Sequence, residues 1–211
     1  MALADKFYFK RINSFIWLVN RDWEKFGIVH GMTGVDLGLT KIAQSEKLAN
    51  LGRVIGAPRI LVPNQVHGAA VVSVESQSCV GEGDAIVAKR DGDERIAVGV
   101  VTADCVPILF WNDSHIGAIH AGWRGLAVGG IGNALKQVSC TDIKIVIGPC
   151  ASVARYEVGK EVIEQLDRDA VFRRDGTKVY LDLVETAKAQ ILKITPKAEI
   201  ATADICTISD S

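Results

Sequence analysis

The chain has 211 residues, with 24 basic and 25 acidic side chains and a formal net charge of −1. A chain of this length suits one large domain and buries enough surface to fold without a disulfide or a metal. It contains no basic run and no stripe of Arg and Lys interleaved with aromatic residues, which argues against nucleic-acid binding. The longest apolar run near the N-terminus, Phe15–Val19, is too short for a signal peptide or a membrane span. We therefore expect a cytoplasmic protein without a membrane or nucleic-acid partner.

The cysteine pattern argues against a disulfide framework and against a zinc finger. The five cysteines are widely spaced and contain no Cys-x-x-Cys pair: Cys79, Cys105, Cys140, Cys150 and Cys206. An odd number of scattered cysteines is not typical of a disulfide framework. We expect four of the five to be inert thiols.

The predicted elements cover the chain with no Pro/Gly-rich linker and no internal repeat, which favours a single domain over residues 1–211. Apolar runs bounded by Gly, Asn and Asp predict strands at Phe7–Phe9, Phe15–Val19, Arg59–Val62, Ala70–Val74, Ala85–Ala88, Ile96–Thr102, Pro107–Trp111, Ile116–His120, 143–148, Val179–Leu181 and Ala198–Ala201. Helical spacing predicts helices at Lys41–Ile55, after a loop within Gly122–Val138, at Glu157–Asp167 and at Leu183–Ile194. Strands cluster in the middle of the chain, so we predict an α+β fold with a mixed β-sheet flanked by helices.

Three stretches place polar side chains at the ends of predicted strands, where sheet proteins carry functional groups. They are "NQVHG" with His67, "VTADCVPILF" with Cys105, and "IGAIHAGWRG" with His120. We call these three residues the His–Cys–His trio. Two imidazoles and a thiolate suit a zinc site with an open fourth position, and copper also accepts them.

Other interpretations of the trio remain open from the residues alone. A single His at a strand end is often a hydrogen-bonded core residue, and a single Cys is often a small core hydrophobe. Cys105 could also act as a nucleophile with a histidine as its base. The spacing of the trio does not resemble a compact metal motif, so it does not decide between these alternatives.

Five stretches in order resemble one known family: "NQVHG", "GEGDAIV", "TADCVPILF", "HAGWRGLAVGGI" and "IGPCASVARYEVGKEV". They are similar to the YfiH family, also called the laccase-domain or polyphenol-oxidase-like family, which includes a peptidoglycan editing factor. The resemblance is dense from Arg59 to Val162 and reaches Cys206 more weakly. It implies the α+β fold that this family shares with the catalytic domain of cytotoxic necrotizing factor.

The resemblance also implies a metal site and an activity. The family's metal ligands correspond to His67, Cys105 and His120, and the metal is usually zinc, with copper also proposed. Members are described as purine nucleoside phosphorylases that accept adenosine, inosine, guanosine and methylthioadenosine, and adenosine deamination is also attributed to them. The implied small-molecule partners are therefore purine nucleosides and phosphate.

The sequence departs from the family pattern at both ends. Residues 30–40 read "HGMTGVDLGLT", so the family's Thr-Arg-x-Gly-Gly core is missing although His30 and Gly31 remain. After "CT" the sequence reads "ISDS", where the family has an aromatic segment with paired arginines. Arginine is the natural bidentate ligand of phosphate. Among the stretches that match, Arg124 is the best remaining candidate for that contact, against the alternative of a solvated or helix-capping arginine.

Roles for the neighbouring residues follow from this hypothesis. Asn64 and Gln65 are candidate substrate contacts, and Gln65 or Asp104 could supply the hydrogen bond that the leaving purine needs. Asp104 could equally orient a metal-ligating histidine, and Glu157 is expected at a helix N-terminus. We keep three alternatives: a copper-binding polyphenol oxidase, an editing hydrolase acting on peptidoglycan precursors, and a non-catalytic binder of metal or nucleoside. The first is disfavoured because four histidines cannot build a multicopper cluster. The sequence does not define the oligomeric state.

Overall fold

The computed structural model describes residues 6–13, 15–34, 44–74, 81–90, 95–138 and 142–210. The chain forms two compact units, one of Met1–Leu61 with Gly92–Ala97, the other of Val62–Asp91 with Val98–Ser211. The organisation as a single domain stays a prediction.

The first unit is built on a small antiparallel sheet in the order β1-β2-β3. Its elements are β1 (Phe7–Ile12), β2 (Phe15–Asn20), α1 (Arg21–Lys25), β3 (Met32–Thr33), α2 (Gln44–Ile55), β4 (Arg59–Leu61) and β7 (Ile96–Val98), the last two pairing with each other. The Asn20 side chain accepts hydrogen bonds from the amides of Asp22 and Trp23 and so begins α1 directly after β2. Trp17, Val19 and Leu51 are buried together in the apolar core of this unit.

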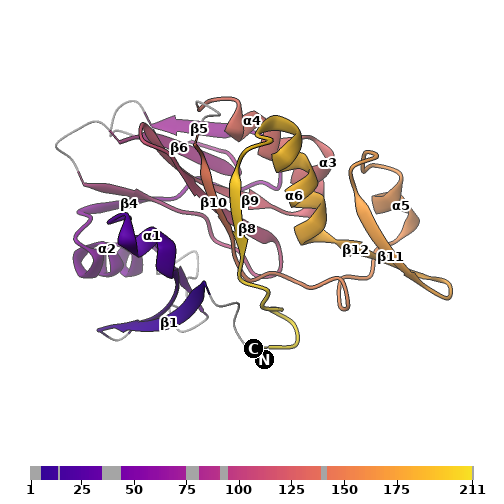
Figure 1. Ribbon diagram of the computed structural model, residues 1–211, viewed down its shortest axis with the longest axis horizontal. Helices are drawn as coiled ribbons and strands as arrows, with labels where there is room; N and C mark the ends of the chain where they lie inside the picture. The colour runs from indigo at the N-terminus through magenta and orange to yellow at the C-terminus, as the bar shows by residue number, and fades with distance from the viewer. Residues whose placement is uncertain are drawn as a thin grey trace. The chain divides into compact units, whose positions relative to one another are not determined.

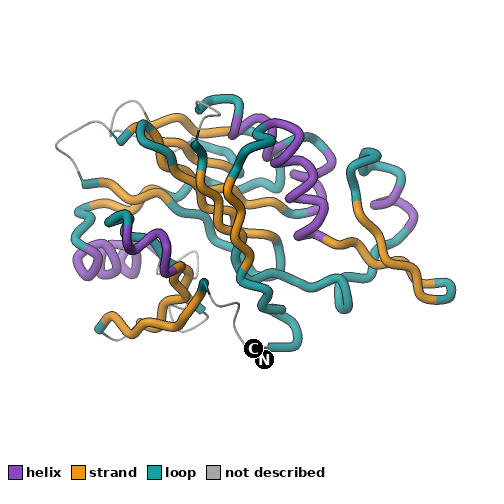
Figure 2. Tube along the Cα trace, in the orientation of Figure 1, coloured by secondary structure: helices purple, strands orange, loops and turns teal. Residues whose placement is uncertain are grey.

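The second unit contains a six-stranded mixed sheet in the order β13-β10-β8-β9-β6-β5 (Figures 1 and 2). Its strands are β5 (Val71–Val74), β6 (Ala85–Lys89), β8 (Val106–Trp111), β9 (His115–Ala121), β10 (Lys144–Ile147) and β13 (Glu199–Thr202). The outer pairs β5·β6 and β10·β13 are parallel and the inner pairs are antiparallel. The mixed sheet flanked by helices that the sequence predicts is confirmed.

Helices α3 (Trp123–Ala127), α4 (Gly130–Leu135) and α6 (Leu183–Ile194) pack on one face of this sheet (Figure 1). Side chains alternate between the two faces of a strand, and the core under the helices contains Val106, Ile108 and Phe110 of β8 and Ile119 and Ala121 of β9. His120, between the last two, therefore points to the opposite face. The remaining elements are α5 (Lys160–Ile163) and the hairpin of β11 (Val171–Asp175) with β12 (Lys178–Asp182).

Three predicted elements differ from the structure, and one observed strand was not predicted. The strand predicted to reach Thr102 ends at Val98, because the side-chain amide of Gln65 occupies the backbone N–H and C=O of Val101. The loop expected after Gly122 is absent: α3 begins at once, and Gly129, with φ +78°, separates it from α4. The helix expected at 157–167 is reduced to α5, and β11, which is mostly charged, was not predicted. Residues 41–43 of the predicted helix Lys41–Ile55 lie outside the described residues.

Candidate metal centre

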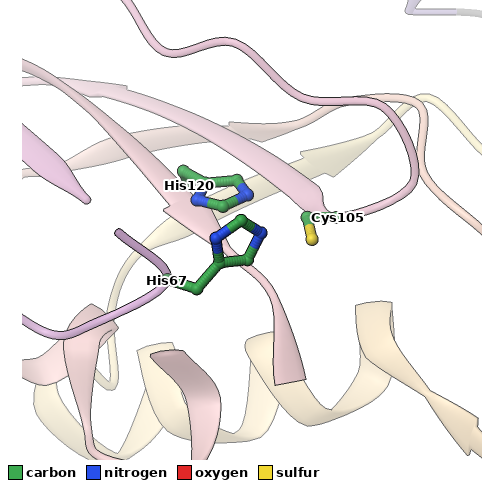
Figure 3. Close-up of side chains that lie close together, drawn as sticks. All are labelled: His67, Cys105 and His120. Carbon is green, nitrogen blue, oxygen red and sulfur yellow. The ribbon is translucent and has the colours of Figure 1, made fainter. Parts of the chain in front are cut away.

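Two members of the trio are brought together by the register of the central hairpin. Val106 of β8 pairs with Ala121 of β9, so Cys105 and His120 lie diagonally across the same end of the two strands. Their side chains share the face that the helices do not cover. His67 reaches the same place from the loop that precedes β5, and its ring meets the ring of His120 edge-on, with 4.8 Å between centroids (Figure 3). The ligand atoms of all three residues lie within 4.8 Å of one another.

A buried carboxylate that the sequence analysis did not single out fixes the orientation of His120. Asp84 precedes β6, is 2% exposed, and its Oδ1 lies 2.8 Å from Nδ1 of His120. Burial alone would raise the pKa of Asp84, but hydrogen bonds from His120 and from three backbone amides hold it below its usual value. An ionised Asp84 can only accept hydrogen bonds, so Nδ1 of His120 carries the proton. Nε2 therefore has a free lone pair for a metal.

The same carboxylate shapes the loop that carries His67. The backbone amides of Val66, His67 and Gly68 donate to the two Asp84 oxygens at 3.2, 2.9 and 2.6 Å. His67 has φ +61°, in the left-handed region that residues other than Gly uncommonly adopt. Asp84 stabilises this turn because it satisfies three consecutive amides that point inward.

The electrostatics of the trio favour a neutral imidazole beside a protonated thiol. Burial lowers the pKa of His120, and the Asp84 hydrogen bond offsets this only in part, so His120 is neutral near pH 7. Burial raises the pKa of Cys105, the charges of Asp104 and Asp84 raise it further, and Arg124 opposes them. The thiol is therefore protonated at neutral pH, and a bound cation would have to displace its proton.

The donor set fits a tetrahedral ion with one open position. Ligands at ordinary zinc distances would lie about 3.3–3.6 Å apart. Because the ligand atoms of the trio lie within 4.8 Å of one another, the side chains would have to close by no more than about 1.5 Å. Gly122 helps to leave this room, because a Cβ at that position would lie 2.8 Å from Sγ of Cys105. The chemistry of two imidazoles and a thiolate suits zinc and also copper.

The other predicted site residues have the following contacts. Asp104 is exposed, and its Oδ1 accepts from the Thr207 hydroxyl at 2.7 Å. The carboxylate that orients His120 is Asp84 instead. Gln65 forms two hydrogen bonds of 2.8 Å with the backbone of Val101. Asn64 is exposed and forms a parallel bridge with Glu82.

Arg124 lies exposed at the start of α3, with its guanidinium 4.4 Å from the centre of the Trp123 ring. Its charge lowers the pKa of both Cys105 and Tyr156, so it lies near the trio. Burial raises the pKa of Tyr156, and Cys105 and Asp104 raise it further. Tyr156 is thus a half-buried phenol beside the site that sequence reasoning missed, although "RYEVG" lies within a matching stretch.

Two further residues have structural roles. In the first unit, Nε2 of His30 accepts from the Asn20 amide and Nδ1 lies 2.8 Å from the Ile28 carbonyl, so the backbone engages both ring nitrogens. The prediction of Glu157 at a helix N-terminus is wrong. Glu157 forms an antiparallel bridge with Tyr180, and its carboxylate pairs with Lys178 at 2.8 Å.

Comparison with known proteins identifies the family. Residues 38–211 match the family model described as "multi-copper polyphenol oxidoreductase laccase". The chain belongs to this family. The resemblance to YfiH and laccase-domain proteins is therefore confirmed. Within the described residues, no helix has the length and apolar character needed to cross a bilayer.

Relatives and a solved structure agree with this assignment. A purine nucleoside phosphorylase of Aquifex aeolicus is 36% identical over 155 residues, which cover 72% of this chain and 73% of the relative. Adenosine deaminase RL5, from an unknown prokaryotic organism, is 32% identical over 175 residues, which cover 70% of this chain and 65% of the relative. The crystal structure of YlmD from Geobacillus stearothermophilus has a TM-score of 0.77 at 23% identity, over 94% of this chain and 88% of YlmD. The fold of the chain is that of YlmD.

Proposed function

We propose that the protein is a zinc-dependent purine nucleoside phosphorylase that acts on adenosine, inosine, guanosine and methylthioadenosine. The observation that carries the proposal is the His–Cys–His trio, with His120 held by Asp84 in the tautomer that binds a metal. The relative from Aquifex aeolicus, named a purine nucleoside phosphorylase, supports the same activity. A zinc ion held by the trio would supply Lewis-acid stabilisation of developing negative charge.

The residues around the trio would bind and orient the reactants. Arg124 is exposed beside the trio, and a guanidinium there would hold an oxyanion such as phosphate by paired hydrogen bonds. Asp104 presents an exposed carboxylate next to Cys105 and would exchange a proton or hydrogen bond with the leaving purine. The exposed Asn64 would contact substrate, whereas Gln65 would act mainly by holding the His67 loop against Val101.

Adenosine deamination is the second candidate activity, and the relative named adenosine deaminase RL5 favours it. Deamination needs activated water in place of phosphate and a group that moves a proton to the departing ammonia. Asp104 is the candidate for this proton-moving group, because its carboxylate is exposed next to the trio. Glu157 is less suited to this role because it is paired with Lys178.

A nucleoside assay with and without phosphate tests both activities. The purified protein, with its metal content measured, is incubated with adenosine or inosine, and the products are separated by chromatography. Phosphorolysis predicts free base and ribose 1-phosphate only when phosphate is present. Inosine from adenosine without phosphate would identify deamination, and copper in place of zinc would favour the oxidase-like alternative. No turnover of either nucleoside would reject the proposal in favour of the peptidoglycan or binding alternatives.

Variants of two arginines sharpen the test of phosphate binding. Arg124→Ala should raise the KM for phosphate by about 10-fold or more, the loss expected for a hydrogen-bonded charge contact of 1.5–3 kcal/mol. Arg168→Ala removes an exposed arginine from the same unit and serves as the matched control. Equal phosphate KM values for the two variants would remove Arg124 from the phosphate site.

A further inference from the structure

Two cysteines outside the trio lie directly opposite each other. Cys150 follows β10 and Cys206 follows β13, and these parallel strands pair through Ile147 and Thr202. Beyond the strands the chains pair again: the amide of Cys150 donates to Ile205, the amide of Thr207 donates to Cys150, and the two cysteines form a parallel bridge. Residues so paired lie about 5 Å apart with side chains on the same side of the ladder. This spacing falls within the range that a disulfide accepts.

The two sulfurs have different surroundings. Burial alone would raise the pKa of Cys206, but hydrogen bonds from Ser152, Ser209 and the Ile208 amide lower it to about 6. The Ser152 amide lies 3.4 Å from this sulfur. Burial raises the pKa of Cys150 to about 12, and the charges of Asp182 and Cys206 act in the same direction. The pair thus combines one thiolate nucleophile with one protonated thiol, the combination found in reactive dithiols.

The dithiol is connected to a ligand of the trio through Asp104. The backbone carbonyl of Asp104 accepts from the amide of Ala151, which follows Cys150, at 2.9 Å. The side chain of Asp104 accepts from the hydroxyl of Thr207, which follows Cys206, at 2.7 Å. Both segments that carry the dithiol therefore hold the residue next to Cys105.

We propose that Cys150 and Cys206 form a peroxide-sensitive dithiol whose disulfide restrains the Asp104–Cys105 segment and slows release of metal from the trio. The Cys206 thiolate attacks one oxygen of a hydroperoxide, the O–O bond breaks, and the alkoxide leaves and takes up a proton. The Cys206 sulfenic acid is then attacked by Cys150. The S–S bond forms as the S–O bond breaks, and the Cys150 proton leaves with the hydroxide as water. Two thiols are oxidised and one peroxide is reduced.

A short exposed turn follows Cys206 and covers it. Residues 208–210 are exposed, with Ile208 at 47%, whereas Cys206 beneath them is 6% exposed. The turn is held by the Asp210 carboxylate, which accepts from the Cys206 amide at 2.9 Å. Opening this short turn would expose Cys206 without disturbing the buried strands. Hydrogen peroxide is small enough to pass through such an opening and is therefore a suitable probe.

The test treats the zinc-loaded protein with hydrogen peroxide and maps disulfides in an unreduced proteolytic digest. We expect a Cys150–Cys206 cross-linked peptide and a mass loss of two hydrogen atoms that dithiothreitol reverses. Cys150→Ser should stop at a sulfenic acid that dimedone traps on Cys206, and Cys206→Ser should form neither product. Ser209→Ala should slow the cross-link because the Ser209 hydroxyl is one of the groups that lower the pKa of Cys206.

A chelator-competition assay measures the consequence for the trio. Zinc release to excess EDTA should be several-fold slower from the cross-linked protein than from the reduced protein. The Cys206→Ser variant, treated in the same way, reports any direct oxidation of Cys105. Absence of the cross-linked peptide, or equal release rates once it has formed, would overturn the proposal. Neither measurement involves a nucleoside, so its failure is distinct from failure of the proposed activity.

Discussion

Asp84→Asn is the substitution whose effect the structure defines most closely. Each Asp84 oxygen accepts two hydrogen bonds: Oδ1 from His120 Nδ1 and the His67 amide, Oδ2 from the Val66 and Gly68 amides. An asparagine has one amide NH₂ group, which it must turn toward one of these two donor pairs. Two inward-facing donors then lose their acceptor in either orientation. A hydrogen bond to a charged group contributes about 1.5–3 kcal/mol, so the loss of two should cost the metal-free protein about 3–6 kcal/mol of unfolding free energy.

Metal affinity should fall together with stability. Loss of a group that orients a ligating histidine typically reduces affinity by 10- to 100-fold. Competition with a chromogenic zinc chelator measures affinity, and urea unfolding in EDTA measures stability. Asp113→Asn is the matched control, since Asp113 is exposed in the turn at the opposite end of the β8–β9 hairpin. An Asp84→Asn protein with zinc affinity and stability equal to those of the control would refute this account of the site.

Three further predictions concern the trio and the retained His30–Gly31 pair. Gly122→Ala places a Cβ 2.8 Å from Sγ of Cys105 and should weaken zinc binding at least several-fold; Gly81→Ala, with no atom within 4 Å of its Cβ, should not. Because the pKa of Cys105 is raised, zinc binding near pH 7 should release about one proton from this thiol, and affinity should rise as pH rises toward the thiol pKa. Calorimetry in buffers of different ionisation enthalpy measures this release, and its absence would contradict a protonated thiol. Gly31→Ala places a Cβ 2.0 Å from the buried Trp17 ring and should lower the unfolding free energy by about 1–3 kcal/mol, while the zinc content stays unchanged. Thermal unfolding measures the loss of stability, and Gly34→Ala, with no atom within 4 Å of its Cβ, is the control.

The sequence predicted the three residues that the structure brings together, but not the carboxylate that orients His120 and the His67 loop. Imidazole and thiolate side chains at strand ends already indicate metal chemistry, and Cys105 and His120 flank one β-hairpin, so their proximity follows from local pairing. Asp84 resembles an ordinary turn residue before a buried strand. Its role depends on the pairing of β6 with β9, which places it beside His120, and on a loop whose amides turn inward. Such long-range pairing leaves no periodic signal in the sequence.

Two predictions of secondary structure were wrong because other hydrogen bonds compete with the expected strand or helix. The apolar pattern near Val101 resembles a strand. The Gln65 side chain, however, forms hydrogen bonds with the backbone N–H and C=O of Val101, which a neighbouring strand would otherwise bind. Residues 157–167 resemble a helix, but Tyr156, Glu157 and Val158 pair with β12, which delays the helix until after Gly159. Side-chain-to-backbone bonds and a neighbouring hairpin thus override local preference.

The left-handed backbone of His67 has a consequence for the history of this position. Glycine or asparagine would adopt φ +61° with less strain, and neither has an imidazole. The turn alone would favour glycine at this position, so the imidazole side chain accounts for the histidine. Homologous chains that lost the metal should drift toward glycine or asparagine at this position, while those that kept it should tolerate the strained histidine. The backbone angle thus offers a criterion for separating active members of a lineage from inactive descendants.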